Sequence, residues 1–510
     1  MLQVRDFPAP DEDPQFDPDN LKYSCIRYVP DATMNAMGPS WVDPVTGEIL
    51  NASVLVYNDI IKLINNWRFV QTSQVDERVR AVKMPQDIID ESMVYVISHE
   101  IGHTLGLMHN MGASSAYPTD MLRDAAFTAD HGTTPSIMDY ARFNYVAQPG
   151  DKGVKLVPPA LGVYDEYAIK WLYTPVPEAK DIWEEAAIAG KIIDDKAGDP
   201  LYRYGAQQVT NSASYGTYDP SARTEDLGDD PIKSSDYGIK NLKYILPRMN
   251  EWLGADDKDF THRGALYTQL TNQYYRYIGN VLAQVGGIYL NNVKDGSAVK
   301  PSVPVARKVQ KASLKWVVSQ LCSSSWINEP SVTSNLPLAT PESNKICAVV
   351  AKSLVSTVPN NVMLSAAVPE VSRPYTIKDY YDDLYTEVFA SSIAGRKLAS
   401  EERTLQREVL MASSKDVKSV LSRSFAEETD KYLDGSDWCS YDACNLGEGQ
   451  PPFQKAVSVL TIDESDGCRI LFLNKVKALC LSRRYSASSE DKAHYEFLLA
   501  RVNSALQNQK

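Results

Sequence analysis

The sequence predicts an α+β protein in which a small twisted sheet and one long helix are followed by a mainly α-helical region. Two observations lead to this fold class. Segments rich in β-branched and aromatic residues occur before residue 60, whereas from residue 234 onward apolar residues recur at the three-and-four spacing of helices. With 510 residues, 44% of them hydrophobic, the chain can build a sizeable core, and its length suggests roughly two to four domains.

Two strands are predicted near the start of the chain. Residues 1–20 are rich in aspartate and proline, a composition that resists packing, so we expect an acidic linker there. Residues 23–29 read as a strand, and after a loop rich in glycine and proline, residues 48–57 read as a second strand.

A long helix is predicted from Pro85 to Leu105. Proline suits the first helical turn, and acidic side chains favour its positive end, as do Asp87, Asp90 and Glu91. Apolar residues repeat every four positions and are predicted to form the buried stripe, with His99 and His103 opposite: Met93, Ile97, Ile101 and Leu105.

This helix carries the sequence H-E-I-G-H-T-L-G-L-M-H over residues 99–109. His99 and His103 are four residues apart and therefore project from one face. Gly106 can adopt the positive φ of a sharp turn, which brings His109 in as a third ligand. Three imidazoles suit zinc and leave a fourth position open, as in hydrolytic sites.

Glu100 points roughly 100° away from the first histidine around the helix and is therefore spared from ligation. It is placed to take a proton from a zinc-bound water and pass it to a leaving group, as a general base. A histidine on a helix is more often an ordinary surface or core residue, and HExxH alone is only moderately specific. With five fixed residues, a chance match has a probability on the order of 10⁻⁵.

HExxHxxGxxH resembles the extended zinc motif of the metzincin metallopeptidases, which also carry a methionine-containing turn beneath the metal. Residues 136–140, S-I-M-D-Y, supply such a turn, with Met138 29 residues after His109. The resemblance implies that Met138 packs below the histidines and that the Tyr140 hydroxyl helps stabilise an oxyanion. The alternatives are that Met138 is core filler and that Tyr140 merely packs beside it.

The residue after the third histidine is Asn110, where astacins have Glu and serralysins have Pro, so the chain matches neither subfamily. Longer stretches resemble the large bacterial zinc-dependent proteases called the Met-zincin family. The likeness runs from about residue 20 to 250 and is most specific between 99 and 151. The segments that show this likeness are Gly38-Pro39-Ser40, Asp43-Pro44, Thr46-Gly47-Glu48-Ile49, residues 136–151, Tyr164-Asp165 and Ala168-Ile169-Lys170-Trp171.

The resemblance implies a metzincin-like catalytic domain over residues 21–176. Its second strand, residues 48–57, is similar to the metzincin edge strand that binds an extended peptide, which would make Ile49, Asn51 and Ser53 substrate-binding residues; such a strand is more often merely structural. One strand and a helix of the metzincin sheet are missing from this pattern, so we expect the chain to be the C-terminal part of a longer precursor. The resemblance also implies a location outside the cytoplasm, periplasmic, cell-surface or secreted, although no signal peptide is present.

Beyond the catalytic domain we expect a helix over residues 164–173, an irregular connecting segment over 177–233 and the helical region over 234–510. Its helices are predicted near residues 236–253, 262–288, 303–322, 345–355, 377–412 and 488–507. The last opens with Ser488-x-x-Asp491, a capping box. In the connecting segment, five acidic residues could form a calcium loop, but a solvated acidic turn is favoured: Asp219, Glu225, Asp226, Asp229 and Asp230.

Composition excludes several classes of protein. The net charge of −13 and the absence of a long basic cluster argue against a nucleic-acid partner, and no apolar run reaches the length of a transmembrane segment. Seven cysteines are too scattered for a disulfide scaffold, although Cys439 and Cys444 could pair. The remaining histidines are expected to be structural or surface residues, with His131 close enough to Met138 to border the cleft: His131, His262 and His494.

These patterns together predict a zinc-dependent endopeptidase with one catalytic Zn²⁺ and a polypeptide substrate. Calcium could be a second cofactor, but no sequence motif supports it. The sequence does not indicate the oligomeric state. One alternative is a degenerate peptidase that acts as a binding or scaffold module with a structural zinc, against which the intact Glu100 argues. Another is zinc-dependent hydrolysis of a non-peptide substrate by the same residues.

Overall fold

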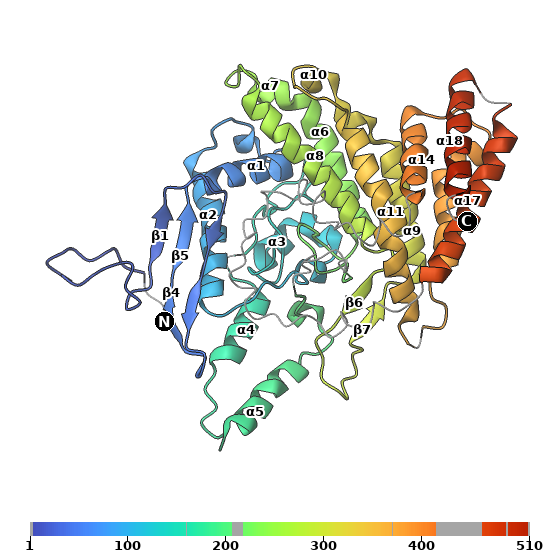
Figure 1. Ribbon diagram of the computed structural model, residues 1–510. Helices are drawn as coiled ribbons and strands as arrows, with labels where there is room; N and C mark the ends of the chain where they lie inside the picture. The colour runs from blue at the N-terminus through green and yellow to red at the C-terminus, as the bar shows by residue number, and fades with distance from the viewer. Residues whose placement is uncertain are drawn as a thin grey trace.

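The computed structural model describes residues 4–159, 161–206, 218–369, 371–414, 462–485 and 488–507. Figure 1 shows a small sheet on the N-terminal side, a central region of loops and short helices, and long helices on the C-terminal side. The described fold is mainly helical with few strands, which is compatible with the predicted α+β class.

Three strands form the first sheet, in the order β1 (Ile26–Val29), β5 (Val54–Tyr57) and β2 (Ala36–Met37). β1 runs parallel to β5, with Ile26 opposite Val54, and β2 runs antiparallel to β5, with Ala36 opposite Val56. In the described part of the chain β5 is therefore the central strand, and β2 lies at an edge of the sheet.

The single strand predicted over residues 48–57 is in fact two strands. β4 (Ile49–Ala52) pairs with β3 (Ser40–Val42) in a separate antiparallel hairpin. The chain changes partner at Ser53, whose N–H donates to the Pro39 carbonyl at 3.0 Å. Alternation of residue types reveals an extended chain but not where its pairing partner changes, so the sequence could not show that β2 forms an edge of the sheet.

Two helices pack behind the sheet, α1 (Ile60–Thr72), which the sequence analysis did not predict, and α2 (Gln86–Thr104), which begins directly after Pro85 as predicted. The buried face of α2 differs from the prediction, because the apolar stripe from Met93 to Leu105 is only partly buried. The fully buried side runs instead through Ser92, Tyr95, Val96, His99, Glu100, Gly102 and His103. The histidines thus lie on the core-facing side, where neighbouring polar groups can hold them.

The centre of the molecule is an irregular segment, residues 132–148, in which every residue is buried. Buried backbone without a helix or strand must find its hydrogen bonds in other loops or among side chains, and here side chains supply several of them. Gln71 accepts from Phe143 N–H at 3.0 Å, and Asn241 donates to the Tyr145 and Ala147 carbonyls at 2.8 Å each. This segment is flanked by two 3₁₀ turns, Ser114–Ala116 and Thr119–Arg123, and by α3 (Ala125–His131).

The helix predicted over residues 164–173 is α4 (Val163–Tyr173). The segment predicted to be irregular, residues 177–233, contains α5 (Ile182–Asp194), whose N-cap residue Asp181 accepts from Trp183 and Glu184 N–H. It also contains the 3₁₀ turn Pro200–Tyr202.

The C-terminal region is helical as predicted, with different boundaries. The predicted helix over 377–412 is interrupted, because Gly395 has a φ of +68° between the helices that flank it. The predicted helix over 345–355 is longer and continues through Pro359. The elements are α6 (Pro231–Ile245), α7 (Met249–Leu253), α8 (Thr261–Leu282), the hairpin β6 (Ile288–Leu290) and β7 (Ser302–Pro304), α9 (Arg307–Cys322), α10 (Pro330–Thr333), α11 (Glu342–Ala367), α12 (Ile377–Val388), α13 (Ala390–Ile393), α14 (Ser400–Ser413), α17 (Ile462–Arg483) and α18 (Ser489–Gln507).

Half of the predicted capping box is present at α18. Ser488 Oγ accepts from Asp491 N–H at 3.2 Å. The Asp491 carboxylate, however, accepts from Leu398 N–H at 3.3 Å and from Arg403 at 3.1 Å, and so ties α18 to the start of α14.

α11 is long and apolar enough to cross a membrane when judged by length and composition alone. The same test is passed by core helices of soluble proteins, so a single helix of this kind is weak evidence. Here α11 packs against α14 and α12, and its inward residues Ile346, Val350 and Leu354 are buried in the main core.

Two cores hold the molecule together. The smaller one lies between the sheet, α2 and the irregular segment and contains Trp67, Tyr95, Met138 and Tyr140. The larger one runs without interruption from Phe69 in α1 to Ala505 in α18. It crosses the predicted domain boundary, because Tyr145 packs against Tyr277 of α8 with ring centroids 4.8 Å apart.

Candidate metal centre

The side chains of His99, His103 and His109 converge at the C-terminal end of α2. Nε2 of His103 lies 3.1 Å from Nε2 of His99 and 3.0 Å from Nε2 of His109. All three side chains are buried. Within the described ranges, they are the one group of three or more histidine, cysteine or acidic side chains close enough to share a metal ion.

Backbone carbonyls determine which imidazole nitrogens face this centre. Nδ1–H of His99 donates to the Ile137 carbonyl at 2.7 Å, and Nδ1–H of His103 donates to the Leu107 carbonyl at 2.9 Å. A carbonyl can only accept, so each of these Nδ1 atoms carries the proton and each Nε2 presents a lone pair toward the centre. These lone pairs would repel unless a cation lay between them.

The spacing of the nitrogens also suits zinc. A tetrahedral ion with metal–nitrogen bonds of about 2.05 Å separates its ligand atoms by roughly 3.3 Å, close to the observed distances. Burial lowers the pKa of His103 to about 4. Burial and the neighbouring His103 and His109 lower the pKa of His99 well below its ordinary value. These two imidazoles are therefore held in the neutral form that binds a metal.

The turn that brings in His109 forms at Gly106, where φ is +85°. The helix closes there, with Leu107 N–H donating to the Gly102 carbonyl at 3.1 Å. Gly106 is exposed, and a Cβ at this position would meet nothing within 4 Å. Its role is therefore conformational, because the backbone angle and not the available space excludes other residues.

Met138 lies below the histidines and is fully buried. A Cβ on Gly102 would overlap the Met138 sulfur, so the glycine within H-E-I-G-H allows the methionine to pack directly on the helix. The sequence analysis did not assign a role to Gly102. The neighbouring Asn110 N–H donates to the Met138 carbonyl at 3.0 Å, which joins the third ligand's peptide to the same turn.

Asp165 of α4 holds this turn in place. Its carboxylate accepts from Ser136 Oγ at 2.6 Å, Ile137 N–H at 2.8 Å and Gly162 N–H at 2.7 Å. Burial raises the pKa of Asp165, and these hydrogen bonds oppose that rise. Since the Ile137 carbonyl accepts from His99, the carboxylate supports a predicted zinc ligand through the backbone of one residue.

Glu100 is completely buried, and its backbone lies beside the end of the edge strand β2. Gly38 directly follows β2, and a Cβ there would overlap the Glu100 carbonyl oxygen. The edge strand and the zinc-motif helix therefore approach each other at backbone distance. This contact places the edge of the sheet beside the predicted general base.

The ring of Tyr140 lies among the ligands. Its centroid is 4.6 Å from that of His109 and 5.5 Å from that of His99. The guanidinium carbon of Arg142 lies 4.0 Å from the centre of the Tyr140 ring. The sequence alone does not predict this role of Arg142, because no local pattern links an arginine to a ring two residues before it.

The sequence model of the Met-zincin family matches residues 81–395, which include the three histidines, the methionine turn and the helices from α6 to α13. The chain belongs to the Met-zincin family. Membership indicates a zinc metallopeptidase, and the triple-histidine group is compatible with the zinc that the family implies. Searches of curated proteins and of solved structures found no match.

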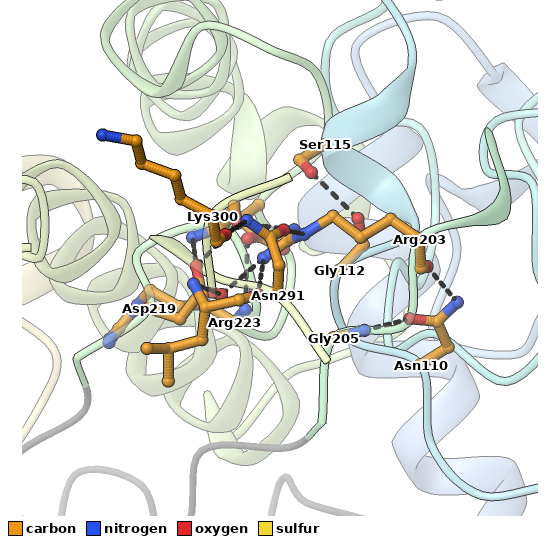
Figure 2. A network of polar contacts seen from close by, with 12 residues as sticks. Asn110, Gly112, Ser115, Arg203, Gly205, Asp219, Arg223, Asn291 and Lys300 are labelled. Carbon is orange, nitrogen blue, oxygen red and sulfur yellow. Dashed lines mark hydrogen bonds and ion pairs between the residues drawn. The ribbon is translucent and has the colours of Figure 1, made fainter. Parts of the chain in front are cut away.

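In this Met-zincin chain, the residue after the third histidine forms a clamp. Figure 2 shows the Asn110 amide facing the backbone of residues 203–205. Asn110 Nδ2 donates to the Arg203 carbonyl at 3.0 Å, and its Oδ1 accepts from Gly205 N–H at 2.8 Å. Glu or Pro at this position could not make both bonds, which gives a physical reason for the departure from astacins and serralysins.

Arg203 extends the clamp to the β6–β7 hairpin (Figure 2). Its guanidinium pairs with Asp219 at 2.5 Å and donates to the Leu290 carbonyl at 3.0 Å and to Asn291 Oδ1 at 3.2 Å. The backbone beside His109, the third predicted ligand, is thereby connected to an element nearly two hundred residues away in sequence.

The acidic residues predicted to form a solvated turn are largely buried partners of the protein. Asp219 pairs with Arg203, and Glu225 lies 3.3 Å from Arg276. Asp226 accepts from Ser114 Oγ at 3.1 Å, while Asp229 and Asp230 accept from backbone N–H groups of Thr119 and Lys233. The prediction of a solvated turn was therefore wrong for Asp219, Glu225 and Asp226, which are buried, whereas Asp229 and Asp230 are exposed as predicted. Charge density in a sequence does not show which partners lie across the fold. The calcium alternative stays without support.

The predicted substrate-binding residues have other contacts. Asn51 is buried and donates to the Leu21 and Tyr23 carbonyls at 2.9 and 2.8 Å. Ser53 is buried as well, and Ile49 is partly exposed. A substrate role for these three residues stays a prediction.

Other candidate residues lie away from the histidines. A cavity of about 420 Å³ is lined by His131, Tyr117, Lys155 and Glu166 among others, and its lining includes none of the zinc-motif residues. His494 is part-buried against Gln406, and the backbone N–H of His262 donates to Asp257. Cys439 and Cys444 lie outside the described residues, and five other cysteines are free.

Proposed function

We propose that the chain is a zinc-dependent endopeptidase in which His99, His103 and His109 hold one zinc ion. The observation that carries the proposal is the arrangement of imidazoles, of which two are anchored on carbonyls through Nδ1–H and all three direct Nε2 to a common point. Such anchoring is characteristic of metal-binding histidines. Zinc bound there supplies a Lewis acid that lowers the pKa of a water molecule to about 7.

The protein's own groups would then move the proton. Glu100, next to the first ligand on α2, accepts a proton on its carboxylate from the attacking water and gives it to the leaving amine. The Tyr140 phenol donates a hydrogen bond to the oxygen on which negative charge develops. An extended polypeptide would approach along the edge strand β2, adjacent to Glu100. A location outside the cytoplasm stays part of this proposal by resemblance.

A second candidate is a binding or scaffold module with a structural zinc. Burial favours it, because His99, Glu100 and Tyr140 are all 0% exposed. A hydrolytic site needs a path for water and substrate, whereas a structural site does not. The presence of a carboxylate next to the first ligand favours the enzyme, since a structural site has no use for a base.

The experiment measures bound zinc and cleavage of an unfolded, fluorescently labelled protein by wild type and by Glu100→Gln. We expect both to bind about one zinc per chain and the variant to lose a factor of 10² to 10⁴ in rate. Glu185→Gln, an exposed glutamate in the first turn of α5, is the control and should retain full activity. Full activity of Glu100→Gln would refute the mechanism, and zinc binding without any cleavage by wild type would favour the scaffold.

A further inference from the structure

Two strained residues meet behind Tyr140. Among the described residues, three that are not glycine have a positive φ: Arg142 (56°), Glu225 (56°) and Phe260 (63°). The left-handed region is unfavourable for an L-residue, so such residues persist where the surrounding structure imposes them. The first two form an ion pair, with Arg142 Nε 3.9 Å from Glu225 Oε1.

Both residues contact Tyr140 directly. The Arg142 guanidinium lies over the Tyr140 ring at 4.0 Å and over the Trp67 ring at 4.2 Å, so it is held between two aromatic faces. The backbone N–H of Glu225 donates to the Tyr140 carbonyl at 3.0 Å. The side chain of Tyr140 is thus held by one member of the pair and its backbone by the other.

The ion pair itself is supported from α1 and α8. Glu225 accepts from Gln71 at 2.6 Å and lies 3.3 Å from Arg276, and Arg142 is 0% exposed. Burying charges is costly, and an ordinary core could hold an aromatic ring with apolar side chains alone. A planar cation, however, keeps a ring stacked in one orientation, which apolar neighbours do not require.

This series of contacting side chains ends at the metal centre, where the rings of Tyr140 and His109 are tilted by 57°. From Trp67 it continues through Arg142 and Tyr140 to His109, whose ring centroid is 4.6 Å from that of Tyr140. A swing of the Tyr140 side chain about its Cα–Cβ bond would break these contacts and move its hydroxyl relative to the three histidines. A displacement of about 1 Å at a reacting group can cost on the order of 100-fold in rate.

We propose that Arg142 and Glu225 are positioning residues that hold the Tyr140 phenol against the zinc site for the reaction. The inference rests on the proposed function, in which Tyr140 donates to the developing oxyanion. Neither residue touches the substrate, and both act through Tyr140. The role assigned to them is separate from zinc binding.

The test is a double-mutant cycle of kcat and KM on the full chain with Tyr140→Phe, Arg142→Met and the combined variant. We expect each single variant to lower kcat by about 10- to 100-fold with little change in KM. Added to Tyr140→Phe, the Arg142→Met substitution should change kcat by less than about twofold, because the hydroxyl it positions is gone. A merely structural role would reduce kcat by the same factor with and without Tyr140→Phe, which would overturn the inference.

Two further variants distinguish the coupling to Tyr140 from a general loss of folding. Glu225→Gln keeps the hydrogen-bonding shape of the side chain and should reproduce the coupling to Tyr140. Arg80→Met removes a guanidinium that lies 4.4 Å over the Trp252 ring, away from the metal site, and should leave kcat unchanged. Bound zinc should stay at about one per chain in every variant. Wild-type kcat in Tyr140→Phe would overturn this inference, while an inactive Glu100→Gln would leave the proposed function standing.

Discussion

The carboxylate of Asp165 acts on the predicted zinc ligand His99 only through backbone atoms. It accepts from Ser136 and from Ile137 N–H, and the carbonyl of Ile137 then accepts from Nδ1 of His99. Sequence analysis recorded Asp165 only as part of a resemblance. A residue 66 positions after the first ligand becomes its support because α4 packs under the methionine turn.

Asp165→Ala should therefore weaken zinc binding by about 10- to 100-fold, because loss of a supporting contact typically costs that much metal affinity. It should also destabilise the fold by about 3 kcal/mol, since two buried N–H groups lose their acceptor. Zinc affinity is measured by competition with a chelator of known affinity. Asp181→Ala, which removes the cap of the exposed helix α5, is the control and should leave zinc affinity unchanged; equal affinity in Asp165→Ala would contradict the argument.

A second buried carboxyl should affect stability in a pH-dependent way. Burial raises the pKa of Asp226 to about 7, beside Asp139, whose pKa burial and Asp226 also raise. In the unfolded chain an aspartate loses its proton near pH ~4. The folded protein holds the extra proton between these values, so this contribution to stability is complete below about pH 4 and is lost as the pH rises to about 7.

The free energy of unfolding of wild type minus that of Asp226→Asn should thus fall as the pH rises from about 4 to about 7. Taking the difference cancels the opposite trend of the buried histidines, which are present in both proteins. Urea titrations at several pH values measure it. A difference independent of pH would show that the Asp226 pKa is not raised in the folded state.

At the scale of elements, three glycines determine where the zinc-motif helix ends and which segments pack closely against it. Gly106 ends it with a positive φ, Gly102 admits Met138, and Gly38 admits the edge strand. The end of the helix is predictable from sequence because a HxxGxxH spacing requires a turn. The other two close approaches depend on partners distant in the chain.

Gly106→Ala should cost about 1 kcal/mol of stability from backbone strain and should also weaken zinc binding, because His109 follows the turn. Gly47→Ala is a matched control, since Gly47 has a φ of +76° and likewise no atom within 4 Å of a Cβ. Both variants should lose similar stability in thermal unfolding of the zinc-free protein. Only Gly106→Ala should lower zinc affinity, and an equal effect of both variants on affinity would contradict this assignment.

At the scale of the whole molecule, the metal site depends on the C-terminal helices. Asn241 of α6 satisfies the carbonyls of the buried irregular segment, and Arg276 of α8 pairs with Glu225 behind Tyr140. The larger core joins residues from Phe69 to Ala505. A catalytic domain over residues 21–176 stays a prediction, and these contacts link its residues to the helical region.

A fragment of residues 1–233 should consequently fail to fold, because removing α6 and α8 leaves buried backbone groups and aromatic side chains such as Tyr145 exposed. Near-ultraviolet circular dichroism and zinc content, compared with those of the full chain, measure the outcome. A soluble fragment with a structured aromatic spectrum and one bound zinc would show that the helical region is dispensable for the fold.

Spacing along the chain predicts the zinc-motif helix, its end at Gly106 and the helical character of the C-terminal region, and the family resemblance adds the methionine turn. These features follow from spacing along one helix or from a local turn, which a linear pattern expresses. Packing between distant segments, in contrast, makes residues 48–57 two strands and places β2 at an edge of the sheet. It also brings Asp165, Arg142, Glu225 and Asn110 around the site. Those roles arise from burial and from partners far away in the chain, and neither can be read from neighbouring residues.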